Sequence, residues 1–359
     1  MSQGGDIRPA IKKLVARVDL SDDEVKEVFD KILNGSVSDA SIAAFLVALS
    51  MKGETPAEVR AALNSARKYA TAITPKIKGS LVDTCGTGGD SIRSFNISTA
   101  AAIVASAAGA VVAKHGNRSV SGPCGSADFL EEIGVSLEAT PQKVKRSIET
   151  VGIGFLFAPV FHPAMKNASN ARKAVGVRTV FNMIGPLSNP CTNLTGQVIG
   201  VFEPRLLDLF AEVCQGYLQD AMVVHAADGF DELSNTCEND ILLIKNGGAP
   251  QRLRVHPKVL NITLAKPERL VVNSKEESIK YTLQAIYGRA PPEHEDIVAM
   301  NASAALVVAG LAIDLREGIT LARKAIRDGR AREKLAEFVE FSGKIQRLKG
   351  AEERFLRLR

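Results

Sequence analysis

The chain has 359 residues, of which 45% are hydrophobic and 24% charged, and its formal net charge is +5. That length allows two domains with substantial cores, and the composition is ordinary for a globular protein. The chain has no Trp, four Tyr and no interleaving of aromatic with basic residues, which argues against a nucleic-acid surface, so the positive charge better suits a small polyanionic substrate.

The first seventy residues carry the pattern of consecutive helices. Ser21 and Glu24 form a predicted capping box ahead of apolar residues at helical spacing, and Ser38 opens a second helix. A third helix begins at 55–58, where an N-cap Thr, a first-turn Pro and a Glu follow in order. The polar segment 73–79 then marks a boundary, so residues 1–74 are predicted to form a helical domain.

From residue 75 onward the pattern alternates between short apolar runs and helical segments. The predicted strands cover residues 80–82, 110–113, 154–157, 197–201, 221–224 and 241–244. This alternation predicts an α/β domain, formed by 75–162 and 191–359, with a central, largely parallel sheet flanked by helices. Residues 163–190 interrupt the pattern and are expected to return to the small N-terminal all-helical domain. The stretch after Glu293 is predicted to be helical.

The sequence argues against membrane association and against disulfides. The longest apolar stretch, 299–313, is interrupted by Asn301 and Ser303 and is too short to span a bilayer, and no basic-then-apolar leader precedes Leu14. We therefore expect a cytoplasmic protein that binds no membrane and no nucleic acid. The five cysteines have no paired spacing and fit neither a disulfide framework nor a zinc site; we expect small buried thiols, with a nucleophilic role left open for Cys85 and Cys124 beside the glycine clusters.

Two glycine-rich polar clusters follow predicted strands and open into helical segments. The first spans residues 86–99, and the second spans 114–119 with its continuation at 125–128. A single cluster of this kind is often only a tight turn. Two of them at the carboxyl ends of parallel strands predict a large phosphate cradle, because glycines let the backbone approach an anion and helix N-termini offer unpaired N–H groups. The first cluster matches neither the P-loop nor the dinucleotide fingerprint.

A pair of adjacent carboxylates, Asp231 and Glu232, follows a predicted strand across a turn. In isolation a solvated acidic turn explains them better, but a phosphate cradle elsewhere in the chain favours an Mg²⁺ site. Asp83 and Asp90 are weaker metal candidates. His115 is a candidate general base or a contact for an aromatic substrate. Arginines on or after the interrupting segment, Arg172 and Arg178, are expected to form surface ion pairs unless one faces a cleft and binds a carboxylate.

These residues together resemble the anthranilate phosphoribosyltransferase family. The resemblance runs from about residue 20 to 336 and rests on six motifs in order: Gly86-Thr-Gly-Gly-Asp90, Phe95-Asn96-Ile-Ser98-Thr99, Lys114-His-Gly-Asn-Arg118, Gly125-Ser-Ala-Asp128, Phe181-Asn182-Met-Ile-Gly185-Pro186-Leu187 and Asp231-Glu232. The chain departs from the family at Ser91, where glycine is common, and at Pro123, where a basic residue or serine is frequent.

The resemblance implies transfer of a phosphoribosyl group from phosphoribosyl pyrophosphate to anthranilate, with two Mg²⁺ ions, in a homodimer formed through the helical domain. It implies that phosphoribosyl pyrophosphate is held by Gly86, Gly88, Gly89, Asp90, Ser94, Asn96, Ser98, Thr99, Lys114, His115, Gly116, Asn117 and Ser126. The metal would be held by Ser98, Asp231 and Glu232. Anthranilate would bind between the domains, near Gly86, His115, Asn117, His162, Arg172, Gly185 and Pro186. No catalytic residue is certain, although His115 is a candidate.

Two alternatives remain at this point. A pyrimidine nucleoside phosphorylase has a similar fold and a glycine-rich phosphate loop, but it would bind orthophosphate without needing Asp231 and Glu232. A non-enzymatic nucleic-acid-binding relative would use the positive charge and should lack His115, Asn117 and Arg172, all of which are present.

Overall fold

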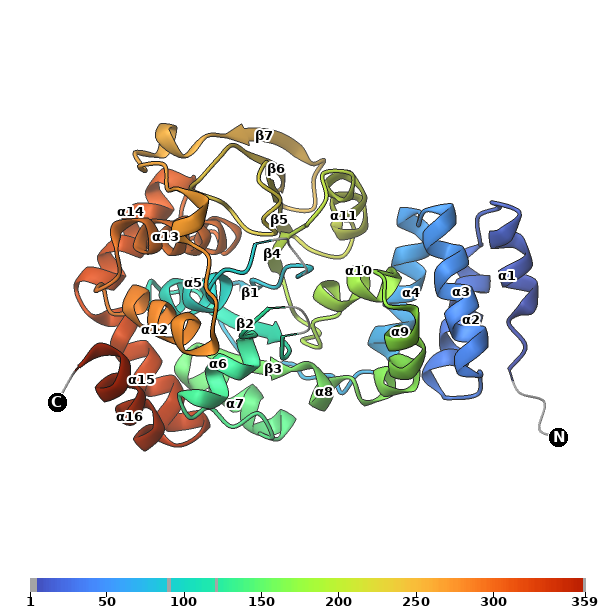
Figure 1. The fold of residues 1–359 in the computed structure, drawn as a ribbon, viewed down its shortest axis with the longest axis horizontal. Helices are drawn as coiled ribbons and strands as arrows, with labels where there is room; N and C mark the ends of the chain where they lie inside the picture. Colours follow the sequence, from blue (N-terminus) through green and yellow to red (C-terminus); the bar gives the residue numbers. More distant parts are fainter. Residues whose placement is uncertain (1–4, 89–91, 120–121, 358–359) are drawn as a thin grey trace. The chain divides into compact units, whose positions relative to one another are not determined.

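The computed structural model describes residues 5–88, 92–119 and 122–357, and the chain folds into two compact units (Figure 1). The helical unit comprises Met1–Ala72 and Ala158–Pro190, and the α/β unit comprises Ile73–Phe157 and Cys191–Arg359. The units differ by a few residues from the predicted domains. Residues 158–162 join the helical unit because the backbone N–H of Thr71 donates to the carbonyl of Phe161, 2.8 Å away. Ile73 joins the α/β unit, where it forms a parallel bridge with Cys191.

Helix caps and a buried ion pair are prominent in the helical unit. The two predicted capping boxes are present, with Ser21 and Glu24 starting one helix and Thr55 and Glu58 another. The carboxylate of Glu58 is fully buried and lies 2.9 Å from the Lys52 ammonium. The helices of the helical unit are α1 (Arg8–Val15), α2 (Asp22–Leu33), α3 (Asp39–Lys52), α4 (Pro56–Lys68), α8 (Ala158–Phe161), η1 (Pro163–Ala168), α9 (Ser169–Val175) and α10 (Val180–Leu187).

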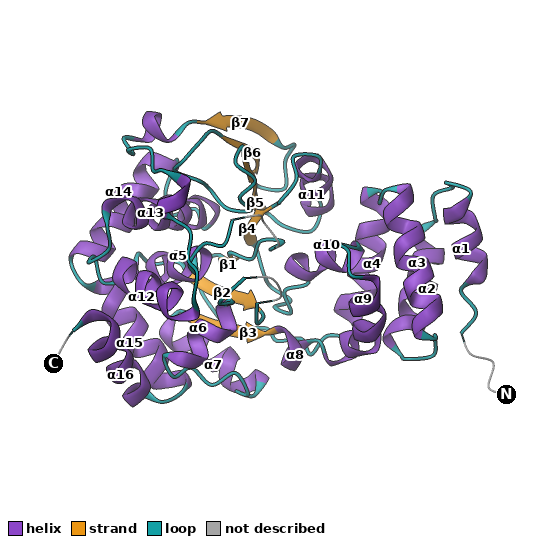
Figure 2. Ribbon diagram, in the orientation of Figure 1, coloured by secondary structure: helices purple, strands orange, loops and turns teal. Residues whose placement is uncertain are grey.

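A seven-stranded sheet runs through the α/β unit (Figure 2). Its strands are β1 (Leu81–Asp83), β2 (Val111–Gly116), β3 (Ile153–Phe157), β4 (Gly196–Gly200), β5 (Asp220–Ala226), β6 (Asn239–Ile244) and β7 (Gln251–Val255). The order is β3-β2-β1-β4-β5-β6-β7, with parallel pairing from β3 to β5 and antiparallel pairing of β6 and β7. The predicted largely parallel sheet is confirmed, with the addition of β7, which the sequence reading missed.

Helices cover the sheet, and two of them, α5 and α13, are almost entirely buried. These two pack against each other and form the centre of the hydrophobic core. The helices of this unit are α5 (Ile97–Ala107), α6 (Ser126–Glu132), α7 (Pro141–Val151), α11 (Leu206–Cys214), η2 (Pro257–Leu260), η3 (Pro267–Arg269), α12 (Lys275–Ile286), α13 (Pro292–Val308), α14 (Leu315–Arg327), α15 (Arg330–Ser342) and α16 (Ile345–Leu356). Within the described residues, no helix is long and apolar enough to cross a membrane.

Strand order identifies where a ligand should bind in the α/β unit. From β1 the chain builds outward through β2 and β3 on one side, and then returns to build β4 and β5 on the other. The order therefore reverses between β1 and β4. In open α/β sheets, ligands bind beyond the carboxyl ends of the strands at such a reversal.

Candidate active site

The loop after β1 packs tightly against the acidic pair after β5. The backbone N–H of Gly88, which has a positive φ of 64°, donates to Asp231 Oδ2 at 2.6 Å, and that of Thr87 donates to the Gly200 carbonyl at 2.9 Å. A Cβ at Gly86 would lie 2.7 Å from Asp231 Oδ2, and one at Gly200 would lie 1.3 Å from the Asp231 carbonyl oxygen. Gly200 therefore has to be glycine, and a side chain at Gly86 would displace the Asp231 carboxylate; together the two glycines bring the first glycine cluster to Asp231.

The second carboxylate faces the N-terminus of α5. The backbone N–H of Ser98 donates to Glu232 Oε1 at 3.0 Å, where the positive end of the helix dipole favours a negative charge. A cavity of about 20 Å³, room for one water or ion, lies at this junction. It is lined by Thr84, Gly86, Ser98, Ala101, Val198, Gly200, Val224, Asp231, Glu232 and Asn301. The structure thus brings the three predicted metal-site residues into one place.

Asn301 holds the acidic loop, and its role was missed in the sequence. It lies in the apolar helix α13 and is 5% exposed. Its side-chain oxygen accepts a hydrogen bond from the Leu233 N–H at 3.0 Å, and its amide donates to the Leu233 carbonyl at 2.8 Å and to the Ile297 carbonyl at 2.9 Å. The available signal was a lone amide within an apolar helical run, since a buried amide has to be hydrogen-bonded.

The ends of β1 and β2 are joined by Asp83, which is fully buried. Asp83 Oδ1 accepts from the backbone N–H of Thr84 at 2.7 Å and of His115 at 3.1 Å. Lys114 and His115 are each 4% exposed, and the Lys114 ammonium donates to the Thr84 carbonyl at 2.9 Å. The second glycine cluster is therefore anchored directly to the first.

Glycine is also required where the second cluster closes on α6. A Cβ at Gly116 would lie 2.4 Å from Ser126 Oγ. The Ser126 hydroxyl donates to the carbonyl of Asn117, an exposed residue, at 3.1 Å. The guanidinium of Arg118 is paired with Asp128 at 2.9 Å and with a neighbouring carboxylate of α6. Gly116, Asn117 and Ser126 are thus in contact, and Arg118 is engaged in ion pairs within the loop.

Some predicted phosphate-site residues are directed elsewhere or cannot be described. The Asn96 amide donates to Ser278 Oγ at 3.0 Å and to Cys124 Sγ at 3.4 Å, which ties the start of α5 to α12. Thr99 is 2% exposed, whereas Ser94 is half-buried and forms a bridge with Val271. Gly89 and Asp90 lie outside the described residues.

The cysteines of the α/β unit are free thiols. One of them, Cys85, lies in the loop after β1, and burial determines its reactivity. Burial raises the pKa of the Cys85 thiol to about 12, and the neighbouring Asp83 carboxylate adds to this rise. A thiol in this state is protonated at neutral pH and is a poor nucleophile. The nucleophilic role left open for Cys85 in the sequence is therefore disfavoured.

The helical unit contains the remaining predicted residues for the aromatic acid. The guanidinium of Arg172 lies 5.0 Å from the centre of the Phe181 ring, and it forms no ion pair with any carboxylate of the described residues. Burial lowers the pKa of Arg172, but a guanidinium stays charged in proteins. A half-buried cation stacked on an aromatic ring is well suited to bind an external carboxylate.

The other predicted anthranilate-binding residues of the helical unit lie between α8 and the end of α10. His162 is 5% exposed, and burial lowers its pKa to about 4, an effect opposed by a hydrogen bond with the backbone of Ser188. At Gly185 of α10, an added Cβ would meet nothing within 4 Å, so open space lies beside this residue. Pro186 follows it within the same helix. His162 is therefore neutral at physiological pH, and Gly185 leaves room for a ligand.

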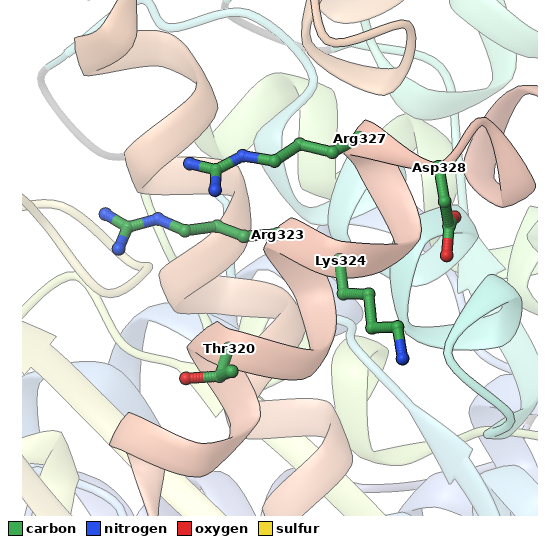
Figure 3. Close-up of a pocket in the computed structure, with 5 residues that line it drawn as sticks. All are labelled: Thr320, Arg323, Lys324, Arg327 and Asp328. Carbon is green, nitrogen blue, oxygen red and sulfur yellow. The ribbon is translucent and has the colours of Figure 1, made fainter.

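A larger hollow, of about 510 Å³, lies along α14 (Figure 3). Arg323 and Arg327 extend side by side from one face of this helix, while Lys324 points the other way. Arg323 is paired with Asp296 at 2.6 Å. All the lining residues come from α14 and the residue after it, so the hollow lacks the converging loops that characterise the site between β1 and β4.

Comparisons with known proteins match both units. Residues 8–70 match the helical bundle domain of a glycosyl transferase family, and residues 78–332 match the a/b domain of that family. The chain is 44% identical over 337 residues to the anthranilate phosphoribosyltransferase of Acetivibrio thermocellus, covering 94% of this chain and 96% of that protein. It is 46% identical over 339 residues to the enzyme of the same name from Thioalkalivibrio sulfidiphilus, covering 94% and 99%.

Solved structures give the same result. The crystal structure of anthranilate phosphoribosyltransferase from Thermus thermophilus has a TM-score of 0.86 and 39% identity, covering 92% of this chain and 98% of that one. The Saccharomyces cerevisiae enzyme, solved in complex with PRPP and Mg, has a TM-score of 0.84 at 23% identity, covering 94% and 97%. The second likeness is one of fold.

Proposed function

This chain belongs to the anthranilate phosphoribosyltransferase family, and we propose that it transfers the phosphoribosyl group at the carboxyl ends of β1, β2 and β4. The observation that carries this proposal is the close approach of Gly86 and Gly200 to Asp231. That contact brings a glycine loop, the N-terminus of α5 and two carboxylates to the point where the strand order reverses. A phosphorylated, metal-binding substrate needs all three features.

Phosphoribosyl pyrophosphate is held mainly by backbone N–H groups and by Lys114. The loop after β1 and the N-terminus of α5 supply donors, and the buried Lys114 ammonium supplies a fixed positive charge. During transfer, the bond between C1 of the ribose and the diphosphate oxygen breaks, and a bond from C1 to the anthranilate nitrogen forms. Catalysis then consists of positioning both reactants and stabilising the departing diphosphate.

The anthranilate amine needs no strong base to attack, because it is neutral near pH 7. After attack the nitrogen carries a positive charge and loses a proton. His115 of the second loop is a candidate to accept that proton, and solvent can serve equally. We therefore assign His115, together with Gly86 and Asn117, to contacts with the acceptor.

Asp231 and Glu232 fit Mg²⁺ because they offer carboxylate oxygens, the ligands that this cation prefers. Both residues line the same small cavity as Ser98. When bound, the ion neutralises the charge of the diphosphate group. We propose two ion positions, one in this cavity beside Glu232 and Ser98 and one outside it, where Asp231 faces Gly88. Metal analysis of the protein with phosphoribosyl pyrophosphate counts the ions.

Arg172 is assigned to the carboxylate of anthranilate. It is the half-buried guanidinium on Phe181 that forms no ion pair within the described residues. His162, Gly185 and Pro186 of the same unit are assigned to the aromatic ring, since His162 is neutral and Gly185 leaves open space. These assignments predict that an acceptor without a carboxylate is a poor substrate.

A homodimer formed through the helical unit is supported by apolar side chains on its surface. Val47 and Met51 lie one turn apart on α3 and are 38% and 68% exposed, and Val15 of α1 is 72% exposed. Helices α1 and α3 pack together. Sedimentation of the wild type and of Met51→Glu tests this: a dimer in the first and a monomer in the second support the interface, and an unchanged mass contradicts it.

The reaction is tested by mass analysis of products. Purified protein is incubated with anthranilate, phosphoribosyl pyrophosphate and Mg²⁺, and in parallel with a pyrimidine nucleoside and orthophosphate. Formation of N-(5-phosphoribosyl)anthranilate in the first mixture alone supports the proposal. Cleavage of the nucleoside without anthranilate turnover would identify a phosphorylase instead.

A further inference from the structure

One cluster of potential metal ligands lies outside the acidic pair, at the ends of β1 and β2. Asp83, Cys85 and His115 each offer one ligand atom, and these atoms lie within 4.8 Å of one another. Asp83 and His115 are buried, and Cys85 is half-buried. Among the residues that the structure describes, this is the only such group of three or more.

The sheet explains how these residues meet. β1 and β2 are parallel, with Val82 level with Val112. Alternate residues of a strand share a face, so Asp83 at the end of β1 lies on the same face as His115 of β2, and Cys85 follows two residues after β1 ends. The Asp83 carboxylate is fixed by hydrogen bonds from the N–H groups of Thr84 and His115, at 2.7 and 3.1 Å. The cysteine spacing alone gave no sign of this group, because its members come from the end of β1, the loop after it and β2.

We propose that Asp83, Cys85 and His115 bind a thiophilic divalent transition metal, such as Zn²⁺ or Co²⁺, separately from Mg²⁺. A thiolate, an imidazole and a carboxylate are ligands of these metals, whereas Mg²⁺ prefers oxygen. Bond lengths of 2.0–2.3 Å in a tetrahedral site place ligand atoms about 3.3–3.8 Å apart. Side-chain shifts of about 1 Å therefore complete the site, with water as the fourth ligand.

The charges around this site favour an ion that binds reversibly. The ion displaces the thiol proton of Cys85 to solvent, and the thiolate and the Asp83 carboxylate then match its two positive charges. The Lys114 ammonium lies beside them, since it donates to the carbonyls of Thr84 and His115 at 2.9 and 3.4 Å. This neighbouring positive charge weakens binding of a cation, which argues against a permanently bound structural metal.

A metal ion at this site should inhibit phosphoribosyl transfer, because its ligands are adjacent in sequence to the two glycine loops. This expectation rests on the proposed function. Cys85 directly precedes Gly86, and His115 directly precedes Gly116. An ion bound to Cys85 and His115 would therefore restrict the movement of both glycine loops. It also occupies the imidazole assigned to the acceptor. Zn²⁺ added at constant Mg²⁺ is therefore expected to inhibit phosphoribosyl transfer.

The test is a Co²⁺ titration of the full chain, followed by absorption. The wild type should show a thiolate-to-cobalt charge-transfer band in the near ultraviolet. Cys85→Ser should lose this band and bind Co²⁺ at least about tenfold more weakly, while Cys237→Ser, which changes the other half-buried thiol, should keep it. Asp83→Asn should keep the band at reduced affinity, and it decides the question if Cys85→Ser fails to fold.

Persistence of the band in Cys85→Ser, or its absence from the wild type, overturns the proposed site. Because the band is read without substrates, an inactive protein that still shows it would contradict the proposed function and leave the metal site in place. Relief of Zn²⁺ inhibition in Cys85→Ser, but not in Cys237→Ser, would link the site to activity.

Discussion

Replacing Asn301 with alanine tests whether the buried amide on α13 positions the Mg²⁺ loop. The substitution leaves the N–H and the carbonyl of Leu233 without the partners they have at 3.0 and 2.8 Å. Each buried polar group left unsatisfied costs about 1–3 kcal/mol, so the loop is destabilised by about 2–6 kcal/mol. A loop that is only partly in its binding conformation binds an ion correspondingly more weakly. We expect the half-saturating Mg²⁺ concentration to rise by at least about tenfold, equivalent to about 1.4 kcal/mol.

The assay is initial-rate turnover across an Mg²⁺ titration, with urea unfolding measured in parallel. Ser303→Ala is the matched control, since Ser303 is also buried on α13 but donates to the Met300 carbonyl of its own helix at 2.6 Å. It should lower stability modestly and leave the Mg²⁺ dependence unchanged. If Asn301→Ala unfolds more easily yet saturates with Mg²⁺ as the wild type does, Asn301 is structural and the positioning role is refuted.

Three further predictions concern the substrates and pH. Arg172→Ala should raise the KM for anthranilate by roughly ten- to a hundredfold, from loss of a charge-assisted bond of about 1.5–3 kcal/mol, with little change for phosphoribosyl pyrophosphate; Arg172→Lys should recover only part, and equal shifts for both substrates would argue against the assignment. Ser98→Ala should weaken phosphoribosyl pyrophosphate by roughly 1–3 kcal/mol and anthranilate much less, as separate titrations will show; equal losses would indicate a folding defect. Burial lowers the pKa of His162 from 6.5 to about 4. Between these pH values the unfolded chain binds a proton that the folded chain does not. Lowering the pH from about 7 to about 4 should therefore reduce the free energy of unfolding by up to about 3 kcal/mol. Urea unfolding at pH 7 and near pH 4 should show a smaller loss in His162→Gln than in the wild type, and equal losses would refute this origin.

Local signals in the sequence predicted three of the capped helices, those that begin after Ser21, Ser38 and Thr55. The capping boxes at Ser21 and Thr55 depend only on neighbouring residues, so spacing was enough to find them. The helix α1 lacks a side-chain cap at Ile7 and was missed. The edge strand β7 was missed because its residues are mostly exposed and lack the apolar run that marked the buried strands.

The candidate site was predictable in its residue types but not in its contacts. Glycines, hydroxyls and adjacent carboxylates are visible as motifs. The clash that makes Gly200 necessary depends on Asp231, which lies on a different loop, and the hydrogen bonds of Asn301 depend on how α13 packs. Such pairings arise from tertiary packing, which spacing along the chain does not encode. The inward hydrogen bond from Asn96 to Ser278 is of the same kind.

We expect this chain to carry out Mg²⁺-dependent transfer to anthranilate through Asp231 and Glu232. The most direct measurement is the loss of anthranilate fluorescence with phosphoribosyl pyrophosphate, first with a chelator and then with excess Mg²⁺. The wild type should turn over only after Mg²⁺ is added, and the double variant Asp231→Asn, Glu232→Gln should be slow and need more Mg²⁺ while remaining folded by circular dichroism. Turnover by the wild type without metal, or wild-type activity of the double variant at limiting Mg²⁺, would contradict the account.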